Sequence, residues 1–120
     1  MSTALGKELR KLRIDHDERL LDMADRVGKS ASFISAVEVG KKSPPVGFED
    51  LVIKAYGLTA GAAEALKRAA DASRKAFLLE PSSALGRDTA GLLARKINTL
   101  SDEQLKEIQA ILGGRPHNER

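Results

Sequence analysis

Apolar residues recur along this chain at the spacing of an amphipathic α-helix. Leu5, Leu9 and Leu12 lie at i, i+4 and i+7, which places them on one face of a helix over residues 3–14. The same period continues through four further segments up to residue 79 and through two shorter segments between residues 87 and 112. Strand character is limited to Ala76–Glu80. The pattern therefore predicts an all-α protein.

Capping residues, glycines and prolines predict where these helices begin and end. Asp17 is the expected cap of the second helix, and Gly28 ends it because glycine adopts the left-handed conformation of a helix exit. The third helix is expected to open at Ser30 or Ala31 and to close at Gly40, the fourth to cover 47–56, and the fifth to run over 59–79. The side chains predicted to face inward from these four helices are Leu20, Met23, Ala24, Val27, Phe33, Ile34, Val37, Phe48, Leu51, Val52, Ala55, Leu66, Ala69, Ala70 and Phe77.

Two helices are predicted beyond the Pro81-Ser82-Ser83 break. One runs from Arg87 to about Asn98, and the other covers 102–112 behind the capping box of Ser101 and Gln104. Their apolar faces have two possible roles, packing against the chain's own bundle or association with a second copy. The tail over 113–120 is polar and rich in glycine, and we expect it to be disordered.

Composition narrows the class of protein. The 120 residues include 20 Lys+Arg, 17 Asp+Glu and no cysteine, which gives a formal net charge of +3. This mild positive excess is compatible with a polyanion partner. The absence of cysteine excludes a disulfide framework and a cysteine-ligated zinc site. Because no apolar run approaches about 18 residues, we expect a soluble, cytoplasmic and nucleoid-associated protein without a membrane segment.

Residue patterns for catalysis or metal binding are weak. The chain has no Cys–His pair, no phosphate-binding glycine loop, and no Ser–His–Asp order with supporting motifs. His16 stands among Asp15, Asp17 and Glu18, but neighbours in sequence do not face one point on a helix, so a solvated loop is the favoured interpretation. We expect no enzyme activity, no metal and no cofactor.

A helix-turn-helix pattern covers the second and third predicted helices. Gly28 separates two short amphipathic segments, Ala24 lies four residues before it, and apolar Ile34 and Val37 follow. This motif places its second helix in the major groove of DNA. The recognition helix is expected over about residues 31–38.

Residues 4–58 resemble the lambda repressor/Cro-like (Xre) helix-turn-helix family of small bacterial and phage regulators. The matching elements are Leu5-Gly6, Leu9-Arg10, Leu12-Arg13, Met23-Ala24, Val27-Gly28, Ser32-Phe33-Ile34-Ser35, Val37-Glu38, Gly40-Lys41 and Ala55-Tyr56-Gly57-Leu58. The resemblance implies a five-helix DNA-binding bundle whose third helix enters the major groove, followed here by two C-terminal helices. It also implies an ion pair between Arg13 and Glu38 that faces a phosphate. The chain departs from the family pattern at Arg19, Leu20, Ala36 and Val39.

The DNA-facing residues follow from the apolar stripe of the third helix, since the opposite side must face outward. Serine hydroxyls can bond base edges and alanine methyls can contact a thymine methyl. The expected base-reading residues are Ser30, Ala31, Ser32, Ser35 and Ala36. Basic side chains around them would contact phosphates, which position a protein without reading sequence. These are Arg13, Arg19, Lys29, Lys41 and Lys42.

The chain is expected to divide into a helix-turn-helix domain over 1–75, a helical dimerisation segment over 76–112 and the tail. A helix-turn-helix monomer makes few contacts, so dimers on half-sites about one DNA turn apart are usual. We therefore favour self-association over packing against the chain's own bundle. The expected interface residues are Leu92, Leu93, Ile97, Leu105, Ile108 and Leu112.

The expected function is that of a sequence-specific transcriptional regulator, most often a repressor in this family, which binds a palindromic operator in double-stranded DNA as a homodimer. An alternative is an antitoxin or other protein-binding module. In that case the C-terminal helices bind a partner such as a toxin or an anti-repressor, while the helix-turn-helix autoregulates.

Overall fold

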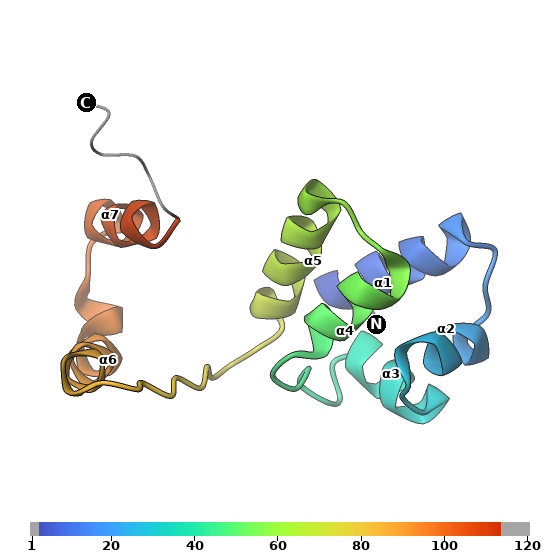
Figure 1. Cartoon of the computed structure of the whole chain (residues 1–120), viewed down its shortest axis with the longest axis horizontal. Helices are drawn as coiled ribbons and strands as arrows, with labels where there is room; N and C mark the ends of the chain where they lie inside the picture. The colour runs from blue at the N-terminus through green and yellow to red at the C-terminus, as the bar shows by residue number, and fades with distance from the viewer. Residues whose placement is uncertain (1–2, 114–120) are drawn as a thin grey trace. The chain divides into compact units, whose positions relative to one another are not determined.

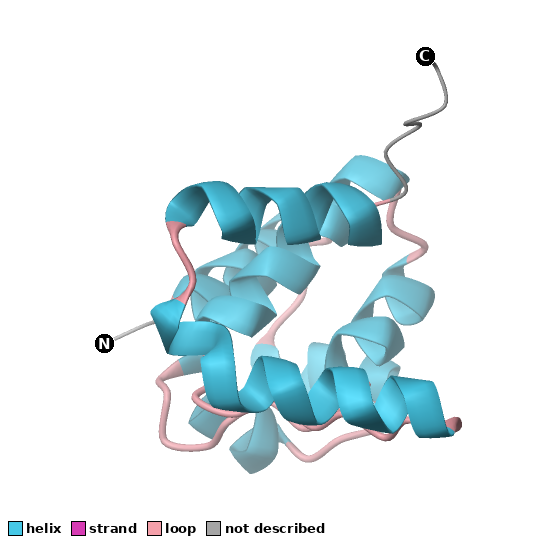
Figure 2. Ribbon diagram, turned by 90° about the vertical axis from the view of Figure 1, so that its left-hand side faces the viewer, coloured by secondary structure: helices cyan, strands magenta, loops and turns pink. Residues whose placement is uncertain are grey.

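The computed structural model describes residues 3–113, and this range is helical and free of strands (Figures 1 and 2). The helices are α1 (Ala4–Asp15), α2 (Leu20–Val27), α3 (Ala31–Glu38), α4 (Phe48–Tyr56), α5 (Ala60–Ala72), α6 (Ala84–Lys96), the 3₁₀ helix η1 (Ile97–Thr99) and α7 (Asp102–Leu112). The prediction of an all-α protein is confirmed. The suggestion of a strand at Ala76–Glu80 is wrong, because this segment is irregular chain.

Contacts along the chain separate it into two units, residues 1–78 with α1–α5 and residues 79–120 with α6 and α7. No helix within residues 3–113 is long and apolar enough to cross a membrane. Residues 114–120, most of the predicted tail, lie outside the described part of the chain.

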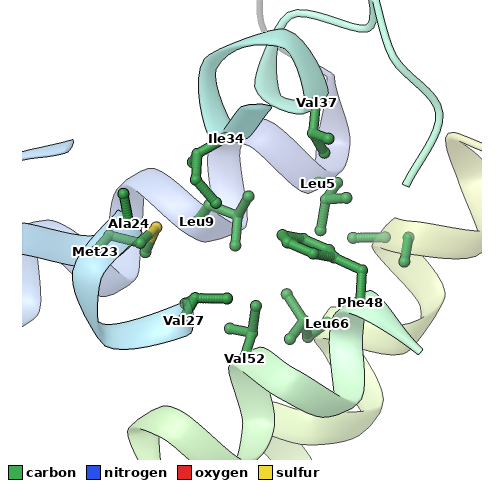
Figure 3. Close-up of a cluster of buried hydrophobic side chains, with 12 residues drawn as sticks. Leu5, Leu9, Met23, Ala24, Val27, Ile34, Val37, Phe48, Val52 and Leu66 are labelled. Carbon is green, nitrogen blue, oxygen red and sulfur yellow. The ribbon is translucent and has the colours of Figure 1, made fainter. Parts of the chain in front are cut away.

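The first unit is built around one apolar core. α1 packs against α3 and α5, and α2 packs against α3 and α4. The side chains converge between these helices in Figure 3. The buried set confirms most of the predicted inward faces and consists of Leu5, Leu9, Met23, Ala24, Val27, Ile34, Val37, Phe48, Val52, Leu66, Ala69 and Ala70.

Two residues predicted to be inward are exposed. Leu51 is 42% exposed because α4 buries Phe48 and Val52, four residues apart, and Leu51 falls beside that pair. Phe77 is 61% exposed because α5 ends at Ala72 and not near residue 79. The chain leaves the helix there to bring Arg74 against the loop before α4.

Helix starts also differ from the predictions in two places. α2 begins at Leu20, where the Arg19 amide donates to Asp22 Oδ2 at 2.8 Å. Asp17 is a turn residue with φ of +55°, and not the cap of α2. α6 begins at Ala84, because Ser83 Oγ accepts from the Gly86 amide at 2.9 Å and so caps the helix earlier than Arg87. The predicted capping box of α7 is confirmed.

Candidate functional site

The turn between α2 and α3 is fixed by its own backbone. Gly28 has a φ of +79°, a left-handed conformation that glycine adopts without steric cost. The amides of Gly28 and Lys29 both donate to Ala24 O, at 2.9 and 3.0 Å. Ser30 then caps α3, its Oγ accepting from the Phe33 amide at 3.0 Å. α2 and α3 consequently lie against each other across a short turn (Figure 1).

The buried side of α3 determines which residues point outward. Ile34 and Val37 are fully buried in the core, and Phe33 packs edge-on against Phe48 with 5.7 Å between ring centroids. Ser30, Ser32 and Ser35 are exposed, and Ala31 and Ala36 are half-buried. The five residues predicted to read bases therefore all have accessible surface on or just before α3.

Glu38, at the end of α3, ties this helix to α1. Its Oε1 accepts from Arg13 Nη2 at 3.2 Å, and its Oε2 pairs with Arg13 Nη1. The Glu38 side chain is only 7% exposed and the Arg13 side chain only 11%. The Glu38 carbonyl accepts from the Thr3 amide at 2.9 Å and from Thr3 Oγ1 at 3.2 Å. The expected Arg13–Glu38 pair is thus present, and it leaves little of Arg13 open for a phosphate.

Gly6 lets α1 approach this end of α3 closely. A Cβ at this position would lie 2.3 Å from the carbonyl oxygen of Glu38, which is closer than any real contact. The family-like Leu5-Gly6 pair therefore has a steric cause in this chain, since glycine alone allows the approach.

Exposed lysines lie at both ends of α3. Lys29 precedes the helix, and the amides of Lys41 and Lys42 bond back to Ala36 O at 2.9 and 3.1 Å after Gly40 reverses the chain. The ammonium groups of Lys29 and Lys42 lie 5.4 and 5.8 Å from the centroid of the same Phe33 ring. Both cations thus contact one ring, a feature that sequence reasoning missed. Exposed cations of this kind can contact phosphates.

Arg19, the remaining residue in the predicted phosphate-contacting set, lies at the start of α2. Its side chain is exposed and its Nε donates to Asp22 at 3.3 Å. An exposed pair of this kind contributes little to stability, so the guanidinium can exchange Asp22 for another anion.

An open depression lies between the start of α2 and the outward face of α3. Its lining residues are Leu20, Ala31, Ser32, Ser35, Ala36, Val39 and Lys41. Four of the residues predicted to read bases belong to this lining. Leu20 and Val39, two positions at which the chain departs from the family pattern, were not predicted as site residues. The lining combines four apolar residues with two serines and a lysine.

Behind the site, a polar cluster holds the turn between α1 and α2 against the end of α4. Glu18 accepts from Tyr56 Oη at 2.7 Å and from Arg26 Nε at 3.0 Å, and the Arg26 guanidinium lies 4.6 Å from the centroid of the Tyr56 ring. Hydrogen bonds from Arg26 and Tyr56 lower the pKa of Glu18. Burial and the adjacent Glu18 carboxylate raise the pKa of the Tyr56 phenol.

His16 belongs to this cluster. Its ring packs edge-on against Tyr56, with centroids 4.9 Å apart, and its Nδ1 lies 3.0 Å from Leu12 O. No group of three or more potential metal ligands lies together within residues 3–113. His16 is exposed and lies in a turn, in agreement with the interpretation as a solvated loop.

Arg74 forms a second, half-buried ion pair that sequence reasoning missed. Its Nη2 and Nη1 donate to Glu49 Oε1 and Oε2 at 2.7 and 2.9 Å. It also donates to the carbonyls of Pro44 and Pro45, at 3.0 and 2.8 Å. The residue lies just after α5 and also contacts Asp71 at 3.4 Å, but Glu49 is 25 positions away, so no local pattern indicates that pair. It fixes the loop that follows Lys42.

The Glu49–Arg74 pair predicts a pH dependence. The hydrogen bonds from Arg74 lower the pKa of Glu49 in the folded protein. The stability that the ion pair contributes is therefore complete above the unfolded-state pKa of about 4.3. This stability is lost as the pH falls through the folded-state pKa of Glu49. Glu49→Gln is expected to lower the stability at pH 7 by about 2 kcal/mol. Thermal unfolding followed by circular dichroism should show that the difference in stability between the unaltered protein and Glu49→Gln becomes smaller below about pH 4.5.

Glu64→Gln is the matched control, because Glu64 is exposed on α5 with only a 3.9 Å contact to Lys67. A change at pH 7 within about 0.5 kcal/mol is expected for this variant. An equal loss in both variants would contradict a specific role for the Glu49–Arg74 pair.

Comparisons with protein-family models, with curated proteins and with solved structures find no match for this chain.

Proposed function

We propose that this chain is a DNA-binding transcriptional regulator whose first unit is a lambda repressor-like helix-turn-helix domain. The observation that carries the proposal is the outward face of α3, where small and hydroxyl side chains lie between exposed lysines at the two ends of the helix. A helix without bulky outward side chains can approach base edges closely in the major groove. Cations at its ends can meet the phosphates on the two sides of that groove.

The buried contacts support this assignment because they hold the docking face rigidly. The pair of Arg13 with Glu38 fixes the end of α3, and the backbone bonds to Ala24 O fix its beginning. Surfaces that bind by positioned contacts are more precise when they lie on such supported helices than on loops.

The second unit is proposed to join two copies of the chain. None of its described residues, 79–113, is buried, and Leu85 and Leu112 are 77% and 78% exposed. A segment of this size without a core needs further apolar contact to be stable. Of the predicted interface residues, Leu92, Ile97 and Leu112 are exposed, and Leu93, Leu105 and Ile108 are half-buried.

A homodimer fits the proposed activity best. Two copies related by a twofold axis would read a palindromic operator, which gives specificity that one short helix lacks. We propose repression as the regulatory outcome, because a dimer seated on an operator blocks access to the DNA beneath it. In the alternative, an antitoxin-like module, a partner protein covers the same apolar faces of α6 and α7.

Lys41→Glu tests the docking face. The variant is expected to bind a selected operator at least tenfold more weakly than the unaltered protein, and the dependence of log affinity on log salt should become shallower by about one unit, because one phosphate contact is lost. Fluorescence anisotropy at several salt concentrations measures both quantities. Ser32→Glu should abolish binding, since it places an anion against base edges and phosphates.

Lys67→Glu is the control for charge alone, because Lys67 is exposed on α5, away from the α2–α3 face. It should retain binding to within a few-fold. Far-ultraviolet circular dichroism must show all three variants folded. Unchanged operator affinity in Lys41→Glu and Ser32→Glu would rule out this face.

Leu92→Asp tests the association of two copies. Light scattering is expected to give twice the chain mass for the unaltered protein and the mass of one chain for the variant, because a buried carboxylate at an apolar interface is costly. Ile14→Asp is the control, as Ile14 is equally apolar but lies exposed on α1. A monomer for the unaltered protein would contradict the dimer and favour a partner protein.

A further inference from the structure

The depression between α2 and α3 has a composition that selects among the groups presented by DNA. Leu20, Ala31, Ala36 and Val39 supply apolar surface, and Leu20 comes from a different helix from the others. Ser32, Ser35 and Lys41 complete its lining. A hollow of this kind suits a small apolar group that projects from a polar surface.

The base edges in the major groove offer one such group. Thymine presents a 5-methyl group there beside its O4 acceptor, whereas the groove edges of guanine, adenine and cytosine carry no methyl group. We infer that the depression receives the methyl group of a thymine, so that the operator carries thymine at a fixed place in each half-site. The inference rests on the proposed DNA-binding function and specifies what its site reads.

The other side chains on this face favour thymine over the remaining bases. Bidentate recognition of guanine uses arginine or lysine, and that of adenine uses asparagine or glutamine. The outward positions of α3 at Ala31, Ser32, Ser35 and Ala36 carry none of these, and the one lysine of the lining, Lys41, follows the helix and is assigned to a phosphate. Methyl contact is therefore the direct readout that these side chains perform best, with the serines free to bond a neighbouring base.

The charge distribution is consistent with a base in the depression. Lys41 lies at the depression, and Lys29 and Lys42 gather at the Phe33 ring. Phosphates bound by these cations would flank the groove floor on which the methyl group stands. In a duplex, the methyl group of a thymine can contact the apolar residues of the depression while nearby phosphates contact the lysines.

Replacement of thymine by deoxyuridine removes the methyl group and keeps every hydrogen bond. Duplexes are first selected by the full-length protein from a random pool, and each thymine of the recovered site is then replaced singly. Replacement of one particular thymine in each half-site is expected to lower the affinity about fourfold, which corresponds to the free energy of burying one methyl group. Replacement of any other thymine should leave the affinity unchanged. Replacement in both half-sites should cost about fifteenfold, as the two losses multiply.

A variant of the depression links the effect to this surface. Val39→Thr replaces a methyl by a hydroxyl of similar size at an exposed helix end, and it should bind the thymine and deoxyuridine duplexes almost equally. Ala36→Ser adds a hydroxyl to a methyl group of the lining and serves if the first variant folds poorly. Lys29→Glu, outside the lining, should weaken both duplexes by the same factor, because a phosphate contact does not depend on the methyl group.

The possible outcomes separate the inference from the proposed function. Recovery of a specific site whose affinity is unchanged by deoxyuridine at every thymine overturns the methyl readout and leaves DNA binding intact. A methyl effect of equal size in Val39→Thr and Ala36→Ser overturns the placement in this depression. Failure of the protein to retain any duplex overturns both.

Discussion

Gly6→Ala is expected to destabilise the first unit by about 3 kcal/mol. Its Cβ would lie 2.3 Å from the Glu38 carbonyl oxygen and 3.0 Å from the Glu38 Cα, so the obstacle is backbone and cannot rotate away. The same carbonyl accepts two bonds from Thr3, which resist any shift of α3 away from α1. Helix propensity favours alanine over glycine by about 1 kcal/mol, and the overlap outweighs this gain.

Gly61→Ala is the matched control. Gly61 lies in the first turn of α5, and a Cβ there meets no atom within 4 Å. The stability of the Gly61→Ala protein is expected to rise by up to about 1 kcal/mol. The same substitution of glycine by alanine thus changes the stability in opposite directions at the two positions. Urea unfolding followed by circular dichroism measures both. A Gly6→Ala protein as stable as the unaltered one would show that α1 and α3 do not approach as closely as described.

The helical fold and the core could be predicted from spacing because both depend on local periodicity. Leu5 with Leu9 and Phe48 with Val52 are separated by four residues and are buried together, as a helix requires. The end of α5 could not be predicted in this way. It depends on Arg74, whose partners Pro44, Pro45 and Glu49 are brought near only by the folded loop.

The candidate site shows the same division between local and tertiary determinants. The outward position of Ser32 and Ser35 follows from the apolar stripe on the opposite side of α3. The approach of Leu20 to that helix, and the gathering of Lys29 and Lys42 at one ring, depend on how α2, α3 and the following turn are placed. Propensity and charge patterns contain no information on those placements.

The ion pair of Arg13 with Glu38 should have the other large effect on stability. Glu38→Ala is expected to cost about 3–5 kcal/mol, because it leaves the Arg13 guanidinium nearly buried without its carboxylate. Arg13→Leu is expected to be similarly harmful, since it leaves the buried Glu38 charge unpaired. The hydrogen bonds from the Thr3 amide and hydroxyl to Glu38 O persist in both variants, so the loss reports the side-chain pair.

The double variant Arg13→Leu/Glu38→Met distinguishes the cost of an unpaired charge from the net contribution of the pair. Replacement of both partners by apolar side chains is expected to recover most of the lost stability, because no buried charge remains. Glu8→Ala, which breaks the exposed pair with Lys11 on the same helix, should change stability by less than about 0.5 kcal/mol.

Operator affinity gives a second measurement on the same variants. If the pair acts by fixing the end of α3, the double variant should regain stability and operator binding together. If the guanidinium also contacts a phosphate, the double variant should be stable but bind more weakly, with a salt dependence shallower by about one unit. A single-variant loss below about 1 kcal/mol in urea unfolding would show that the pair contributes little to holding α3 against α1.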